Sequence, residues 1–106
     1  MNFVSNRDIA VGVKNLETAL KFYEDTLGFK PLEVSPMRRV YNTGYFTLYI
    51  EEGEPHPPVP SLTVEKITEA KAYLLEKGCR ILIEHEKSIY FSDPMGNVWD
   101  IIEVKL

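Results

Sequence analysis

Apolar and polar residues alternate at several places along the chain, a pattern typical of β-strands with one packed face. Near the N-terminus, Ile9, Val11 and Val13 alternate with smaller residues. After Asn15, which favours the start of a helix, apolar side chains recur at helical spacing as far as Leu27. The pattern therefore predicts a strand and then a helix.

The rest of the chain follows the same logic. Gly28 and Gly78 each come directly after a helical pattern, where a glycine favours the left-handed conformation that ends a helix. The other expected elements are strands at 29–34, 38–41, 45–51 and 61–64, a helix at 66–77, and strands at 80–84, 87–92 and 98–104. The order β-α-β-β-β thus occurs twice, and each parallel crossover places its helix on one face of the sheet.

The two halves align as copies of one unit. Leu16 falls on Ile67, 51 positions later, whereas residues 44–51 match residues 96–103 at a spacing of 52. One copy alone is too small to bury a hydrophobic face, so the copies must pack against each other or against a partner chain.

The spacing also predicts the domain organisation. We expect a single domain of two tandem modules, at about 7–52 and 59–105. Residues 53–60 contain four prolines, which exclude a helix, and form the expected linker.

Composition narrows the class of protein. The apolar share of 44% is typical of a globular chain, and a net charge of −4 without a basic stripe argues against a nucleic-acid partner. No apolar stretch reaches membrane-spanning length, so no membrane partner is expected. The single Cys79 forms no internal disulfide, which fits a cytoplasmic protein.

Two segments resemble a known family. Residues 13–29, Val-Lys-Asn-Leu-Glu-Thr-Ala-Leu-Lys-Phe-Tyr-Glu-Asp-Thr-Leu-Gly-Phe, resemble the first-helix signature of the vicinal oxygen chelate superfamily. Residues 91–103, Phe-Ser-Asp-Pro-Met-Gly-Asn-Val-Trp-Asp-Ile-Ile-Glu, resemble its closing motif. That superfamily holds glyoxalase I, extradiol dioxygenases, fosfomycin-resistance enzymes and bleomycin-resistance proteins. The resemblance implies an α+β fold of paired βαβββ modules, in which a curled mixed sheet surrounds a cavity, usually in a dimer. It implies no single reaction.

The resemblance also indicates where a metal would bind. Metal-dependent members take ligands from the first, fourth, fifth and last strands, which corresponds here to Asp8, Leu48, Val59 and Asp100. Leu48 and Val59 have no donor atom, and a divalent catalytic metal normally needs at least three protein ligands. We therefore expect no cofactor and no catalytic metal. Asp8 and Asp100 remain candidates for a two-carboxylate site completed by water, which suits magnesium or manganese.

The two acids have further interpretations. They could bind a cationic or hydroxyl-bearing ligand, act as a general acid and base, or pair with nearby arginines at the rim of the cavity. His56 lies in the proline-rich linker, so its strand register does not suit a ligand unless the linker folds inward. His85 lies in a hairpin turn and is expected to be a solvated loop residue.

Strand alternation and residue type give the ligand-binding candidates. Aromatic side chains suit a flat organic ligand, and Arg38 could hold its carboxylate or phosphate. Phe46, Leu48 and Ile50 are expected to face the cavity, as Asp8 and Asp100 are. The candidates are Asp8, Arg38, Tyr41, Phe46, Leu48, Val59, Ser61, Thr63, Tyr90 and Asp100.

Two functions follow, and whether the protein is an enzyme stays open. The first is a metal-independent module that binds a small organic molecule, like the bleomycin-resistance proteins. The second is a metal-dependent lyase, isomerase or dioxygenase of the glyoxalase I type. A homodimer is expected in either case, because so short a chain would otherwise leave a sheet edge or an apolar surface exposed.

Overall fold

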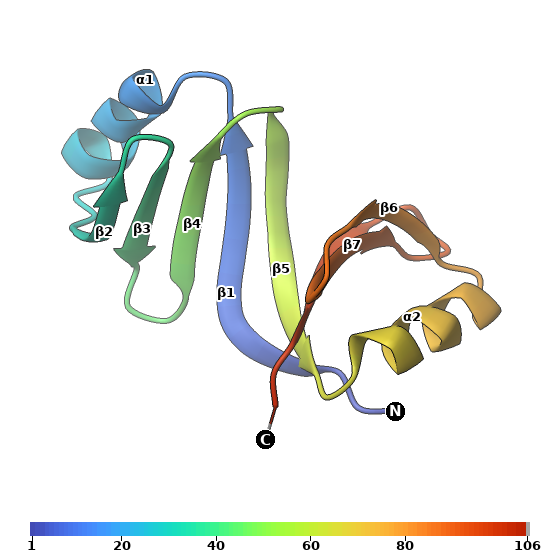
Figure 1. Ribbon diagram of the computed structural model, residues 1–106. Coiled ribbons are helices and arrows are strands. Elements are labelled where there is room, and N and C mark those ends of the chain that lie inside the picture. Colours follow the sequence, from blue (N-terminus) through green and yellow to red (C-terminus); the bar gives the residue numbers. More distant parts are fainter. Residues whose placement is uncertain (106) are drawn as a thin grey trace. The chain divides into compact units, whose positions relative to one another are not determined.

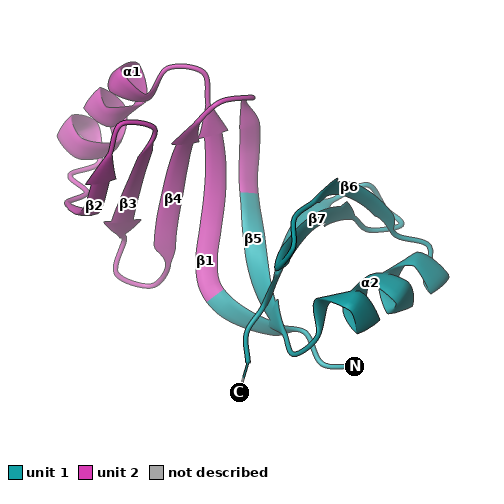
Figure 2. Cartoon of the chain, in the orientation of Figure 1, with its two compact units in different colours: residues 1–6, 59–106 teal, residues 7–58 magenta. Residues whose placement is uncertain are grey.

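The computed structural model describes residues 1–105, which fall into two compact units (Figures 1 and 2). Unit 2 comprises Arg7–Pro58, and unit 1 comprises Met1–Asn6 together with Val59 and the residues that follow it. Strands β1 (Val4–Val13) and β5 (His56–Val64) each begin in one unit and end in the other.

Unit 2 contains the first set of elements. The strand order is β2-β3-β4-β1, with β1 parallel to β4 and the other neighbours antiparallel. The elements that follow β1 are α1 (Leu16–Leu20), the π-helical η1 (Lys21–Thr26), β2 (Pro31–Ser35), β3 (Arg38–Asn42) and β4 (Thr47–Glu52).

Unit 1 repeats this arrangement. The strand order is β5-β8-β7-β6, again with one parallel pair, β5 with β8, and antiparallel hairpins after it. The elements after β5 are α2 (Ile67–Glu76), β6 (Arg80–Glu84), β7 (Ser88–Ser92) and β8 (Val98–Glu103). Each unit has the βαβββ order on a mixed sheet, which confirms the predicted α+β class.

The helix ends follow the sequence signals. The Asn15 side chain accepts a hydrogen bond from the Thr18 N–H at 2.9 Å, and Gly28 and Gly78 have φ angles of +77° and +92°. The first helix departs from the prediction because only Leu16–Leu20 is α-helical. In the π-helical η1 the Leu27 N–H donates to the Phe22 carbonyl, five residues earlier.

A glutamate at the end of each last strand binds the start of its unit's helix. Glu52 Oε1 accepts from the Leu16 N–H at 3.0 Å, and Glu103 Oε2 accepts from the Ile67 N–H at 2.8 Å. A carboxylate is favourable there because the first N–H groups of a helix have no partner within it. Both pairs are 51 positions apart, so the last strands align at 51 rather than at the expected 52.

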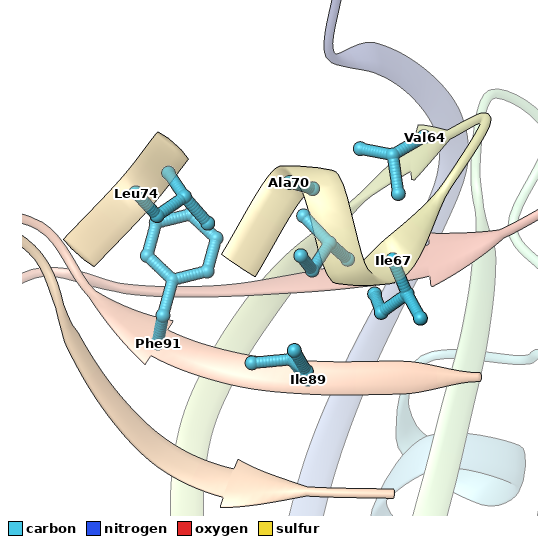
Figure 3. Packing of buried hydrophobic residues seen from close by; sticks show 7 residues of the cluster. Val64, Ile67, Ala70, Leu74, Ile89 and Phe91 are labelled. Carbon is cyan, nitrogen blue, oxygen red and sulfur yellow. The ribbon is translucent and has the colours of Figure 1, made fainter. Parts of the chain in front are cut away.

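Each helix covers an apolar core on one face of its sheet. In unit 1 the buried cluster is Val64, Ile67, Ala70, Leu74, Ile89, Phe91 and Ile101 (Figure 3). In unit 2 it is Val11, Leu16, Tyr41, Leu48 and Ile50. The strand members come from alternate positions, as one-sided burial requires.

The expected linker at 53–60 is wrong over most of its length, because strand β5 already begins at His56. The prolines did correctly exclude a helix. Their fixed φ is compatible with extended backbone, and a proline costs a strand only the hydrogen bond that its missing N–H would have donated.

Candidate functional site

Several of the candidate site residues lie on the face of each sheet that is opposite the helix, which we call the open face. In unit 2 the register pairs Ile9 with Leu48 and Val11 with Ile50, and all four pack in or against the core cluster. The alternate pairs, Asp8 with Thr47, Ala10 with Tyr49 and Gly12 with Glu51, therefore share the open face.

The expected orientation of Phe46, Leu48 and Ile50 is wrong, and the ligand-binding candidate Tyr41 also lies on the helix side. Leu48 is 6% exposed within the core cluster, and Phe46 packs against that cluster. Tyr41 is fully buried there, and its hydroxyl donates to Glu24 Oε2 on η1 at 2.7 Å. Burial and this hydrogen bond raise the pKa of Tyr41 well above its usual range, so the phenol stays protonated. Ile50 is likewise fully buried on the helix side.

A one-residue slip in the alignment explains the errors at Phe46, Leu48 and Ile50. A spacing of 52 sets Leu48 against Asp100, whereas the register sets Ala10 beside Tyr49 and Ser61 beside Asp100. Since Ala10 and Ser61 are 51 positions apart, the counterpart of Asp100 is Tyr49. Tyr49 is therefore a site residue that the sequence argument missed. The matching ends Glu52 and Glu103 of the two last strands were the signal that could have found it.

In unit 1 a buried carboxylate lies on the open face. Asp100 is 7% exposed and accepts a hydrogen bond from the Ser61 hydroxyl at 2.8 Å. The Asn6 amide in turn donates to Ser61 Oγ at 2.8 Å. Tyr90 lies opposite Asp100 on β7. Hydrogen bonds of this kind fix the orientation of a carboxylate that would otherwise be costly to bury.

Two further candidates share this face of unit 1. Thr63 and Val59 alternate with the core residues of β5, so they lie on the same side as Ser61. Val59 is 2% exposed, and its side chain can only offer an apolar surface.

In unit 2 the open face holds an aromatic ring, that of Tyr49, with charged side chains beside it. The Arg38 guanidinium lies 4.8 Å from the centroid of the Tyr49 ring, and Arg38 Nε lies 3.9 Å from Glu51 Oε1. Burial raises the pKa of Asp8. Burial also raises the pKa of Tyr49, and the charge of Asp8 adds to that effect while Arg38 opposes it. The structure thus brings together Asp8, Arg38 and Tyr49.

The other titratable candidates lie apart from these groups. The His56 ring packs against Gly12, where an added Cβ would meet the ring and the Glu54 carbonyl. His56 is thus a residue of strand β5 and not part of a linker. His85 is exposed between β6 and β7. Burial raises the pKa of the Cys79 thiol, which argues against a reactive thiolate.

The donor atoms do not fit a catalytic divalent metal. Within residues 1–105, no group of three or more histidine, cysteine or acidic side chains is placed to hold an ion. With the register corrected, the four positions implied by the family are Asp8, Tyr49, Val59 and Asp100. Valine has no donor atom, and a phenol with a raised pKa is a poor ligand because it keeps its proton.

The comparisons with known proteins agree with this architecture. The family model of the Glyoxalase/Bleomycin resistance protein/Dioxygenase superfamily matches residues 7–101, so the chain belongs to that superfamily. This confirms the resemblance drawn from the two sequence motifs. No curated protein sequence gives a significant match.

Several solved structures share the fold. A variant of homoprotocatechuate 2,3-dioxygenase from B. fuscum matches with a TM-score of 0.70 and 17% identity, over 99% of this chain and 33% of the other. A hypothetical protein from Bacillus halodurans C-125 gives 0.70 and 15%, over 100% and 97%. A protein described as an NAD-dependent benzaldehyde dehydrogenase from Legionella pneumophila gives 0.72 and 19%, over 92% and 98%.

These similarities establish the fold and no more. The chain spans about one third of the length of the dioxygenase. None of the helices formed by residues 1–105 is both long enough and apolar enough to cross a bilayer.

Proposed function

We propose that this superfamily member binds a small organic molecule on an open face of its sheet and needs no catalytic metal. The observation that carries the proposal is the donor set at the four positions implied by the family. Two carboxylates are present, but Val59 offers no donor atom and Tyr49 keeps its proton. The buried polar group around Asp100 and the aromatic group around Tyr49 provide the few well-placed polar contacts that small-molecule sites use.

One observation favours the alternative, a metal-dependent lyase, isomerase or dioxygenase of the glyoxalase I type. Asp8 and Asp100 both lie on open faces, where carboxylates could supply two oxygen ligands. Whether any reaction is catalysed is part of the same question.

Calorimetric titration with manganese, nickel and zinc separates the two functions. We expect no tight binding of any of the three ions. Tight binding that is lost in both Asp8→Ala and Asp100→Ala, while both variants keep the circular dichroism spectrum of the parent, would overturn the proposal and establish the metal-dependent function.

We also propose a cytoplasmic homodimer. Strands β2 and β6 end the strand order of their units and carry exposed apolar residues, among them Leu32 and Val34 on β2 and Leu82 and Ile83 on β6. Exposed edges of this kind favour pairing with a second copy. The cytoplasmic location rests on the single cysteine. Light scattering coupled to size exclusion tests the assembly, and a mass of one chain at all concentrations would contradict it.

A further inference from the structure

A cation already covers the ring of Tyr49. Arg38 and Tyr49 belong to neighbouring strands, where Arg38 lies opposite Glu51 and Tyr49 opposite Val40, so the arginine reaches diagonally across the pair. The separation of 4.8 Å from guanidinium carbon to ring centroid lies within the range of cation–π attraction. One face of the ring is therefore already in contact with a planar cation, the guanidinium of Arg38.

Carboxylates on three strands lie near this ring or near its arginine. Glu51 on β4 lies 3.9 Å from Arg38 Nε. Asp8 on β1 and Glu33 on β2 lie close enough for their charges to raise the pKa of Tyr49. The charges of Asp8 and Glu33 thus act on the ring in the same direction, and that of Arg38 opposes them.

Arg38 is held by Glu51 and by the Tyr49 side chain, but not through a hydrogen bond of its Nε. Its Nε is buried, yet it makes no hydrogen bond to any of residues 1–105, and the side chain is 38% exposed. Moving the guanidinium off the ring breaks its contacts with the Tyr49 side chain but no hydrogen bond of Nε, and it hydrates that N–H. Because the Arg38 side chain is partly exposed, its guanidinium can move into water.

We propose that Tyr49, Asp8, Glu33 and Glu51 form a binding site for a small organic cation, a guanidinium or a quaternary ammonium, which Arg38 occupies when no ligand is present. This deepens the proposed function, on which it rests for the existence of a small-molecule ligand. An anionic ligand would be repelled by the three carboxylates when the Arg38 guanidinium is already paired with one of them. A weakly hydrated organic cation gains both the ring and the attraction of the carboxylates.

Three probes of one shape and different charge test the site. They are choline, the neutral 3,3-dimethylbutan-1-ol and the anionic 3,3-dimethylbutanoate. Titration of each is followed by the aromatic NMR signals of Tyr49, with Tyr45 as the internal reference ring. Tyr45 is 79% exposed and has its own cation, with the guanidinium carbon of Arg7 at 5.5 Å from the ring centroid. We expect saturable shifts at Tyr49 with choline only.

Variants then identify the competitor and the ring. Arg38→Ala should tighten choline binding roughly threefold or more, because the ring face no longer has to be vacated. Tyr49→Phe should keep the binding, Tyr49→Leu should lose it, and Tyr45→Leu should leave it unchanged. If Tyr49→Leu fails to fold, the Arg38→Ala titration still decides.

Several results would overturn the cation site. These are equal shifts with the neutral probe, preferred binding of the anion, no saturable shift at Tyr49 with choline, or weaker choline binding in Arg38→Ala. The metal titration of the proposed function is independent of all of them. If the protein binds neither metal nor choline but does bind the neutral or the anionic probe, the cation site is refuted and the proposed function is not.

Discussion

The two units share one framework and differ on their open faces. The spacing of 51 relates Ile50 to Ile101, and both are fully buried beneath their helices. The same spacing relates Glu52 to Glu103, and both bind the first turn of a helix. At these positions the side that packs against the helix is therefore equivalent in the two units, because close packing leaves little freedom in residue size.

On the open face, equivalent positions hold different chemistry. Ala10 of unit 2 corresponds to Ser61 of unit 1, and Tyr49 corresponds to Asp100. Unit 1 thus has a carboxylate held by a hydroxyl, where unit 2 has an aromatic ring beside an alanine. The comparison teaches that the covered face specifies the fold and that the open face is where the units can acquire separate functions.

The largest expected effects test the shared framework. Ile50→Ala and Ile101→Ala each remove most of a fully buried side chain and should each lower the free energy of unfolding by about 2–5 kcal/mol. Urea denaturation of the two variants measures both costs. Values that differ by more than about 2 kcal/mol would show that the two cores are not equivalent.

Much of the fold could be predicted from the sequence because local signals and one-sided burial agree. Asn15, Gly28 and Gly78 occur where a helix begins or ends, and strand β6 has the predicted bounds. The π-helical η1 could not be predicted, because it depends on how the segment packs and not on spacing. The start of β5 at His56 was missed because prolines were taken to end regular structure.

The site was predicted less well, and one residue of register accounts for much of it. In unit 1, Ser61, Thr63 and Asp100 lie on the predicted face. In unit 2 the alignment was shifted by one position, and adjacent strand residues point to opposite faces. The sequence argument therefore placed Leu48 on the open face and left Tyr49 out of the candidate site. The cation over Tyr49 could not be predicted at all, because it depends on the pairing of β3 with β4.

A smaller effect distinguishes the two first strands. Gly12 corresponds to Thr63, but a Cβ at Gly12 would meet the Glu54 carbonyl and the His56 ring. Gly12→Ala should therefore cost about 1–3 kcal/mol of unfolding free energy through overpacking. Thermal and urea denaturation measure this cost. The control Thr63→Ala, a truncation at a partly buried position, should cost less, and the reverse order would contradict the close approach at Gly12.

The hydroxyl that distinguishes unit 1 should have a cost of its own. Ser61→Ala removes the donor to Asp100 and should lower the free energy of unfolding by about 1–2 kcal/mol, because a buried carboxylate loses a hydrogen bond. Urea denaturation of this variant, of Asp100→Asn and of the double variant Ser61→Ala/Asp100→Asn measures the coupling. If the second substitution restores nothing, the hydrogen bond to a charged Asp100 is not what Ser61 contributes.

The smallest effect concerns the glutamates that bind the helix starts. The Ile67 N–H, and after it Lys87, hold the pKa of Glu103 below its ordinary value of 4.5. A lowered pKa in the folded state means that the stabilisation is complete above pH 4.5 and is lost as the pH falls through the folded-state pKa. Glu103→Gln keeps an acceptor oxygen but removes the charge, so its stability should fall less steeply than that of the parent below pH 4.5. Urea denaturation between about pH 3 and 7 measures both slopes, with Glu52→Gln as the matched variant of unit 2. Parallel curves for Glu103→Gln and the parent would show that the ionised carboxylate adds nothing to the capping of α2.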